Sequence, residues 1–223
     1  MDMELLKQAL IKVFLGFAIV VLLLFLPAGS FEYTNGWIFI ALLFVPMFIA
    51  GFILMKKNPD LLRRRLNAKE KQTEQQDIVK YSAIMFIVGF VLAGLNYRCE
   101  WNELPDFLVY LGIFLFILSY IMYAMVLKEN EFLLRTVEVE KNQKVIDTGL
   151  YGIVRHPMYS ATIILFLSMP LILNSLFTFI IFLVYPYLII KRIDNEEKVL
   201  EKDLKGYKEY KKKIKYKLIP YIY

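Results

Sequence analysis

Five consecutive residues, 155–159 (Arg-His-Pro-Met-Tyr), contain the single histidine of the chain, His156. Pro157 suits the first position of a helix, because the N–H that proline lacks would have no intrahelical partner there. His156 is then expected to be extended, since a residue before proline avoids the α region. The N–H groups and the dipole of a helix N-terminus attract anions. This segment therefore either binds the carboxylate of a ligand or simply caps a helix.

A second polar cluster follows the next apolar stretch. Arg192 and Glu196 are four residues apart and share one face of a helix, whereas Glu197 is turned by about 100°. In a binding site the arginine could hold a carboxylate and a glutamate could receive a cation. The alternative is a solvated ion pair on a juxtamembrane helix, worth about 0.2–0.5 kcal/mol.

The composition is that of an integral membrane protein. The chain is 58% hydrophobic with a mean hydropathy of +0.51, whereas soluble domains are about 45–50% apolar. The net charge of +6 does not indicate nucleic-acid binding, because the basic residues lie between or after apolar spans, where the cytoplasmic leaflet attracts them. The single Cys99 excludes an internal disulfide and a multi-cysteine metal site, and no metal is expected.

The apolar segments predict an all-α, polytopic fold with about six transmembrane helices, a C-terminal cytoplasmic helix and no Rossmann domain. The first four spans are Leu10–Leu26, which we expect to be retained rather than cleaved as a signal peptide, Gly36–Met55, Ile78–Tyr97 and Asp106–Leu127. The final apolar block is too long for one perpendicular helix. We expect a hairpin of about 158–173 and 175–190, divided near Pro170 and Asn174-Ser175; one long kinked helix is the alternative.

Charge distribution predicts the orientation. With six spans, 26 of the 27 Lys and Arg residues lie on the side of both termini, and only Arg98 lies on the other side. The positive-inside rule then makes both termini cytoplasmic, in the cell (inner) membrane if the source is prokaryotic. The 56–77 loop predicts a short amphipathic interfacial helix. The tail should continue the last helix as far as Gly206, then lie on the membrane or fold back over the loop before the fifth span.

Taken in order, five motifs resemble the isoprenylcysteine carboxyl methyltransferase family. They are Val145-Ile146-Asp147-Thr148-Gly149-Leu150-Tyr151, then Val154-Arg155-His156-Pro157-Met158-Tyr159, then Arg192 with Glu196-Glu197, then Gly206-Tyr207-Lys208-Glu209-Tyr210, and finally Ile219-Pro220. The resemblance covers about residues 128–223. It divides the chain into four N-terminal spans, 1–127, and a catalytic methyltransferase region, 128–223, with a cofactor loop, a helical hairpin and a C-terminal helix.

The resemblance implies a membrane enzyme of the bacterial or archaeal type that uses S-adenosyl-L-methionine. Arg192 corresponds to the substrate-site arginine and Glu196 to the cofactor-contacting glutamate, and we place both in the catalytic group. The implied cofactor-binding residues are Gln143, Lys144, Val145, Ile146, Tyr151, His156, Pro157, Met158, Tyr159, Glu196 and Glu197. Two residues depart from the family pattern: Gln143 stands where the family often has histidine, and Leu150 where it often has proline.

The expected reaction is carboxyl O-methylation of a lipidic or prenylated acceptor, which reaches the enzyme from the membrane lipid. A carboxylate is already a nucleophile, so the reaction requires no general base. An amine of a phospholipid head group is an alternative acceptor, but it would need a base and the chain has no second histidine. A sterol-reductase-like enzyme that uses NADPH, and a non-catalytic membrane protein, are further alternatives. The sequence does not indicate an oligomeric state.

Overall fold

The computed structural model describes residues 2–67, 70, 72–130, 132, 136–137, 139 and 143–223, and the regular elements in these ranges are all helices. Five of them are long and apolar enough to cross a membrane. They are α1 (Met3–Ala28), α2 (Thr34–Lys57), α4 (Thr73–Cys99), α5 (Asp106–Glu129) and the combined segment Leu176–Asp203. The predicted all-helical, multi-pass fold is therefore confirmed, and each of the first four predicted spans lies inside one helix.

The final apolar block forms a hairpin, and the alternative of a single kinked helix is wrong. Its first arm is α6 (Pro157–Ile172), the fifth predicted span. This helix has 16 residues and rises about 24 Å, less than the roughly 30 Å of a bilayer core. The chain turns at Asn174, which has a positive φ of 54°. Ser175 then caps the second arm, because its hydroxyl accepts the Thr178 N–H at 3.3 Å.

The second arm consists of α7 (Leu176–Phe182) and α8 (Val184–Asp203), which are interrupted at Leu183. Pro186 provides the physical reason, since it lacks the N–H that would bond to the Phe182 carbonyl one turn earlier. Beyond the apolar part, α8 continues and ends at Asp203, three residues before the predicted stop. Gly206, with φ 88°, instead begins the short helix α9 (Tyr207–Lys213).

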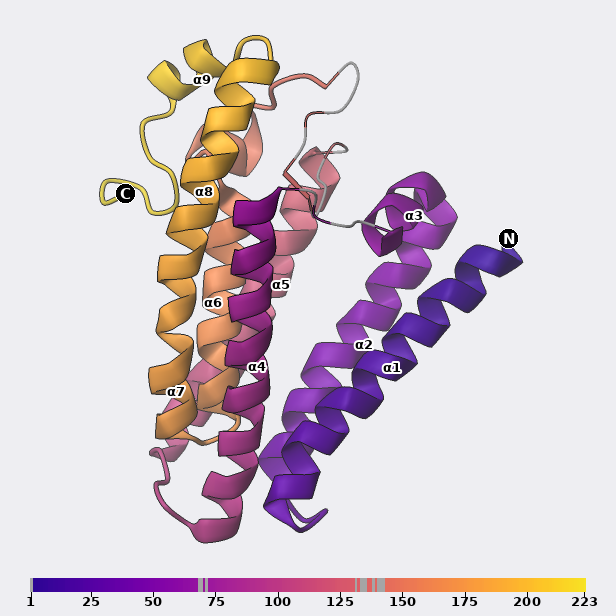
Figure 1. Cartoon of the computed structure of the whole chain (residues 1–223), viewed down its shortest axis with the longest axis vertical. Coiled ribbons are helices and arrows are strands. Elements are labelled where there is room, and N and C mark those ends of the chain that lie inside the picture. Colours follow the sequence, from indigo (N-terminus) through magenta and orange to yellow (C-terminus); the bar gives the residue numbers. More distant parts are fainter. Residues whose placement is uncertain are drawn as a thin grey trace.

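Two groups of helices are visible in Figure 1. Helices α4 to α8 stand side by side as a bundle, whereas α1 and α2 lean away from it toward the end where both termini lie. The two groups meet at the opposite end, where α1 packs closely on α4. A Cβ on Gly94 of α4 would lie 2.3 Å from the Leu24 carbonyl oxygen of α1, so the contact requires glycine.

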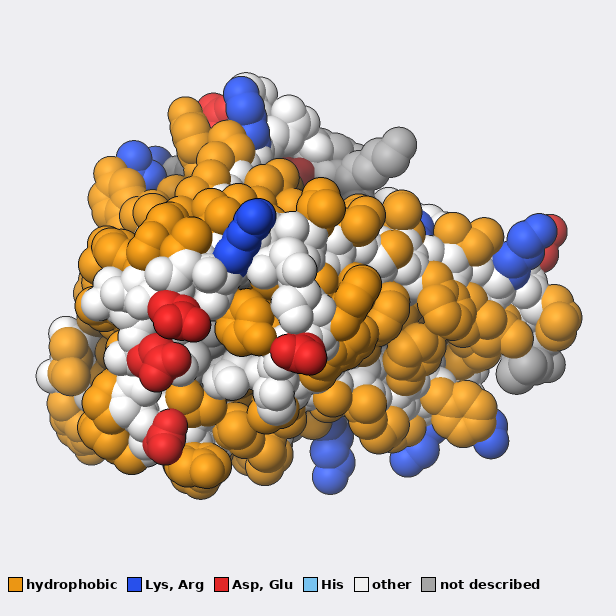
Figure 2. All heavy atoms as spheres, turned by 90° about the horizontal axis from the view of Figure 1, so that it is seen from below, with side chains coloured by type: hydrophobic (Ala, Val, Ile, Leu, Met, Phe, Trp, Pro, Cys, Tyr) orange, Lys and Arg blue, Asp and Glu red, His pale blue; other side chains and the backbone are white. Residues whose placement is uncertain are grey.

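The two ends of the molecule differ in charge, as the sequence predicted. The end with both termini carries α3 (Pro59–Asn67), whose leucines Leu61 and Leu62 are buried while Arg63 and Arg64 are exposed. This is the amphipathic helix predicted for the 56–77 loop. Seen from the opposite end, acidic side chains gather on a mostly apolar surface (Figure 2).

The C-terminal tail folds back over the start of α6, which is the second of the two predicted arrangements. The Arg155 N–H donates to the Tyr216 carbonyl at 2.9 Å, and the His156 N–H donates to the Lys217 carbonyl at 2.9 Å. The Ser160 hydroxyl donates to the Leu218 carbonyl at 2.6 Å. The tail thus forms part of the structure around the only histidine of the chain.

Candidate active site

The His-Pro helix start has the predicted backbone geometry. Pro157 is the first residue of α6, and His156 before it has φ −125° and ψ 60°, outside the helical region. The backbone N–H groups of Tyr159 and Ser160 both donate to the His156 carbonyl, at 3.0 and 3.2 Å. These two amides are therefore engaged within the helix start, and a bound anion would depend on side chains more than the sequence suggested.

The turn before this helix is held by a carboxylate from α5. Gly149 opens a short 3-10 helix, η1 (Gly149–Gly152), with a positive φ of 52°. The Leu150 N–H donates to Glu129 at 3.2 Å. The positive φ favours glycine here, and a Cβ on Gly149 would lie 1.7 Å from a carboxylate oxygen of Glu129, so that this side chain would have to move away from the turn.

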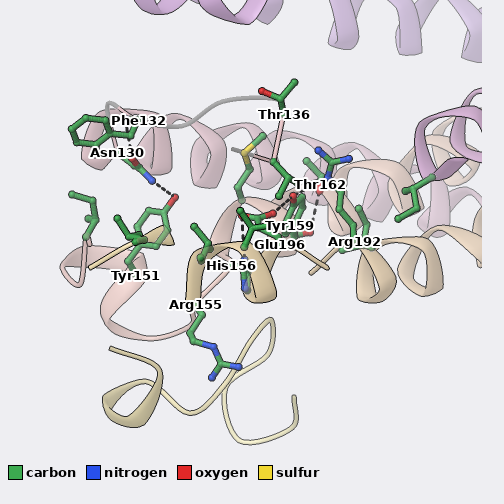
Figure 3. Close-up of a pocket in the computed structure, with 18 of the residues that line it drawn as sticks. Asn130, Phe132, Thr136, Tyr151, Arg155, His156, Tyr159, Thr162, Arg192 and Glu196 are labelled. Carbon is green, nitrogen blue, oxygen red and sulfur yellow. Dashed lines mark hydrogen bonds and ion pairs between the residues drawn. The ribbon is translucent and has the colours of Figure 1, made fainter. Parts of the chain in front are cut away.

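The turn fixes Tyr151 at the edge of the site. Its hydroxyl accepts a hydrogen bond from the Asn130 side chain at 2.9 Å (Figure 3), and its carbonyl accepts one from the Tyr210 hydroxyl at 2.8 Å. Burial raises the pKa of the Tyr151 and Tyr210 phenols well above their ordinary value. Both phenols therefore stay protonated at physiological pH.

Glu197 is the centre of a buried ion cluster. Its carboxylate accepts from Arg155 Nε at 2.7 Å and lies 3.1 Å from His156 Nε2 and 3.2 Å from Lys211 Nζ. The side chains of Arg155, His156 and Glu197 are each at most 5% exposed. The Tyr207 phenol, whose pKa is raised by burial and by the neighbouring carboxylates, lies at 3.5 Å from the same carboxylate. A buried charge needs such partners, since an unpaired one is costly.

Arg155 connects this cluster to the tail. Its Nη1 donates to the carbonyls of Ile214 and Lys215 at 2.8 and 2.7 Å. Figure 3 shows its side chain pointing away from the other labelled residues and toward the C-terminal segment. The arginine of the predicted motif therefore fastens the tail to α6 and α8.

A tyrosine hydroxyl joins the two residues that the sequence placed on one face of the last helix. Arg192 Nε donates to the Tyr159 hydroxyl at 2.9 Å, and that hydroxyl donates to Glu196 Oε2 at 2.5 Å (Figure 3). The other oxygen of Glu196 is 4.0 Å from His156 Nδ1. The structure thus brings His156, Tyr159, Arg192 and Glu196 together from α6 and α8.

These residues face a cavity of about 430 Å³ between the loop before α6 and helices α4, α6 and α8. Ten of the residues predicted for the site line it: Gln143, Lys144, Val145, Ile146, Tyr151, His156, Met158, Tyr159, Arg192 and Glu196. Two other predicted site residues are not among the described residues that line the cavity. Pro157 begins α6, and Glu197 pairs with Arg155 and His156.

The wall supplied by α4 was not predicted. Ile78, Val79, Ser82, Ala83 and Phe86 line the cavity from this helix. Gln75, one turn before them, is fully buried and accepts a hydrogen bond from Arg192 Nη1 at 3.1 Å. A glutamine at the start of an apolar span is a weak signal, because the same residue commonly marks a helix end. Only the packing of α4 against α8 reveals its role.

The fold and the cavity define a polytopic helical membrane protein with a partly polar pocket at one end of its spans. Residues 110–202 match the model of the isoprenylcysteine carboxyl methyltransferase (ICMT) family. The match runs from α5 to the end of α8 and confirms, over this segment, the resemblance predicted from the motifs. Helix α4 and the C-terminal tail lie outside it.

The chain is also similar to a curated protein, Delta(14)-sterol reductase TM7SF2 of Mus musculus. The two are 31% identical over 93 residues, which make up 40% of this chain and 22% of that protein. The chain therefore spans a minor part of the relative it matches.

Proposed function

We propose that this protein is an S-adenosylmethionine-dependent methyltransferase of the membrane, and that it methylates the carboxylate of a lipophilic, isoprenylcysteine-like acceptor. One observation carries the proposal. A single cavity joins the polar group of His156, Tyr159, Arg192 and Glu196 to an apolar wall that runs along the spans. Such a cavity suits a reaction between a polar cofactor and a lipid-like acceptor. The match of residues 110–202 to the family supports the same reaction.

The apolar part of the cavity suits the acceptor chain. Val79 and Ala83 of α4 line it on one side, and Phe166, Tyr185 and Ile189 line it from α6 and α8. Val79 is also 51% exposed and lies within a helix long and apolar enough to cross a membrane. We therefore expect the apolar chain of the acceptor to lie along this part of the cavity.

The polar part fits the cofactor. The side chain of Glu196 is 23% exposed, so its carboxylate can receive the cofactor's ammonium group. Val145, Leu200 and Tyr207 supply apolar and aromatic surface for the adenine ring. The volume of about 430 Å³ is within the usual range of about 300–1,000 Å³ for ligand pockets. When bound, S-adenosylmethionine supplies an electrophilic methyl group on a sulfonium.

The residues of the chain would then act by positioning. Arg192 orients the acceptor carboxylate without transferring a proton, and Tyr159 fixes the direction of the guanidinium from α6. Holding two reactants in line lowers the entropy loss on reaching the transition state. The buried surroundings of His156 and Arg192 keep water away while opposite charges are neutralised.

We further propose that the catalytic region is residues 128–223 together with α4, and that the cavity is at the cytoplasmic end. Both termini, α3 and α9 lie toward this end (Figure 1). The basic residues of the tail, such as Lys208 and Lys212, are exposed there. The positive-inside rule places such an end in the cytoplasm.

A nicotinamide-dependent reductase is the second candidate, because the chain is 31% identical over 93 residues to a Delta(14)-sterol reductase. The two functions require different cofactors, so a binding measurement separates them. If the acceptor were instead the amine of a phospholipid, the cofactor would still be S-adenosylmethionine and only the methylated product would differ.

The first test is calorimetric titration of the detergent-purified protein with S-adenosylhomocysteine and, separately, with NADPH. We expect S-adenosylhomocysteine to bind in the micromolar range, and His156→Ala and Glu196→Ala to weaken binding at least about tenfold, or 1.4 kcal/mol. Asp194→Ala is the matched control, because Asp194 is half-exposed and bonds to Lys217 on the outer side of α8. Thermal unfolding of each variant separates a lost contact from a lost fold. Binding of NADPH alone would move the assignment to the reductase.

The second test identifies the acceptor atom. The protein is incubated with methyl-labelled cofactor and either a farnesyl thioether carboxylic acid or phosphatidylethanolamine. A methyl ester releases its label as methanol in base, whereas an N-methyl group does not. Base-labile label on the thioether supports the proposal, and base-stable label on the phospholipid contradicts it.

A further inference from the structure

Among the residues that the structure describes, side chains from three different segments contact the guanidinium of Arg192. Nε bonds to Tyr159 of α6 at 2.9 Å and Nη1 bonds to Gln75 of α4 at 3.1 Å. Nη2 contacts Glu70, which lies between α3 and α4, at 3.4 Å. The first two partners are neutral, whereas Glu70 brings a negative charge. Its contact is also the longest of the three.

The Glu70 carboxylate contacts Arg192 in the way that we propose for the carboxylate of the acceptor. The side chains of Arg192 and Glu70 are 11% and 9% exposed, so the pair is largely removed from water. Glu70 Oε2 also accepts the Val137 N–H at 3.4 Å, and Val137 lines the cavity. A carboxylate thus already lies where Arg192 would receive the acceptor, at the edge of the same cavity.

Two negative charges limit what Arg192 can bind next. Glu196 is linked to the guanidinium through Tyr159, and Glu70 contacts it directly. A third carboxylate entering beside these two is repelled by both at low effective dielectric constant. An acceptor carboxylate binds Nη2 without this repulsion once the Glu70 side chain leaves that nitrogen. The affinity for the acceptor is then reduced by the free energy of breaking the Glu70 contact.

We propose that Glu70 is a specificity-determining residue that occupies the acceptor-carboxylate position on Arg192 when no acceptor is bound. This inference rests on the proposed function, since it takes the acceptor to be a carboxylate. Glu70 competes with the acceptor and weakens its binding, while leaving the cofactor position beside Glu196 unchanged. It also disfavours anionic molecules that lack a hydrophobic chain, because these have no apolar contacts to offset the displacement of Glu70.

Glu70→Gln tests the proposal. Glutamine has the same shape and its amide oxygen can still accept from Arg192 and Val137, so the substitution removes the charge and keeps the geometry. The matched control is Glu74→Gln, which removes an exposed carboxylate from the first turn of α4. The probe is a farnesyl thioether carrying a carboxylate, titrated into full-length protein saturated with S-adenosylhomocysteine, so that no methyl group can be transferred. The same thioether with a neutral amide is the second probe.

We expect Glu70→Gln to bind the carboxylate probe roughly tenfold more tightly than the wild type, to bind the amide probe with unchanged affinity, and to bind S-adenosylhomocysteine as the wild type does. In turnover the same variant should lower KM for the carboxylate acceptor more than it changes kcat. Glu74→Gln should leave the three affinities, KM and kcat unchanged.

Equal or weaker binding of the carboxylate probe by Glu70→Gln overturns the proposal, and shows that Glu70 only supports Arg192. A selective loss of affinity for an amine acceptor also overturns it, because Glu70 would then be a ligand of the ammonium group. Failure of the wild type to bind S-adenosylhomocysteine overturns the proposed function as well. The two failures are thus distinguished by the cofactor titration.

Discussion

The α1–α2 pair and the α4–α6–α8 group both contain long apolar segments, yet they use their helices differently. In α1 and α2, large side chains such as Phe14, Leu22 and Phe52 are exposed toward the surroundings of the spans. In the other group, Gln75, His156, Arg192 and Glu197 are buried and bonded to one another or to the tail. An apolar helix can therefore serve either as a membrane anchor or as one wall of a site. It lines a site where polar residues at its end bond to polar residues of neighbouring helices.

The largest expected effect comes from breaking the buried ion cluster. In Arg155→Ala, Glu197 loses its closest cationic partner, and the Ile214 and Lys215 carbonyls lose their donor. Breaking a buried pair costs about 3–5 kcal/mol. We expect a large fall in thermal stability in detergent, with loss of S-adenosylhomocysteine binding because the tail no longer covers α6. Lys208→Ala, an exposed change on the same tail, is the control. A stability equal to that of this control would contradict the role of Arg155.

A smaller effect is expected where the two groups meet. Gly94→Ala places a methyl group 2.3 Å from the Leu24 carbonyl oxygen, so α1 must move away from α4. Overpacking of this kind costs about 1–3 kcal/mol. We expect a lower midpoint of thermal unfolding, while S-adenosylhomocysteine binding remains close to wild type, because the contact lies at the end opposite the cavity. A loss of cofactor affinity as large as the loss in stability would show that the two groups are coupled.

Removing the hydroxyl of Tyr159 changes the hydrogen bonds of the site and leaves its shape almost unchanged. Tyr159→Phe leaves Arg192 Nε without that acceptor and Glu196 without that donor. An unsatisfied buried partner costs about 1–3 kcal/mol. We expect kcat/KM for the acceptor to fall roughly five- to 150-fold, with a fall in thermal stability of similar free energy at most. Activity equal to that of the wild type would show that Tyr159 does not position Arg192.

The smallest effect is expected in the outward-facing helices. In the part of the chain that the structure describes, no atom lies within 4 Å of a Cβ built on Gly16 of α1, apart from its own chain neighbours and helix backbone. Gly16→Ala should therefore stabilise the helix by about 0.5–1 kcal/mol and leave the proposed methyltransferase activity unchanged. The midpoint of thermal unfolding measures the change in stability, and the initial rate measures the activity. A marked destabilisation would show that another molecule packs against this face of α1.

Several elements could be predicted because their signals are local. Pro157 and His156 fix the start of α6 through the steric limits of proline, and the structure has that geometry. The length of the apolar block and the polar Asn174-Ser175 pair predicted the hairpin. The exact end of α8 could not be predicted. Gly206 adopts a positive φ as the stop signal requires, but the helix ends three residues earlier and the glycine begins α9.

The sequence by itself determined the all-helical membrane fold, the six apolar segments and ten of the residues that line the cavity, because periodicity, hydropathy and motif order are properties of neighbouring residues. The tertiary structure alone decided which partners these residues have. Glu197 follows Glu196 in the chain, yet it faces Arg155 and His156 instead of the cavity, because the tail closes over α6. Glu70 and Gln75 reach Arg192 only because α4 packs on α8. Such contacts join residues more than a hundred positions apart, and a local pattern does not specify them.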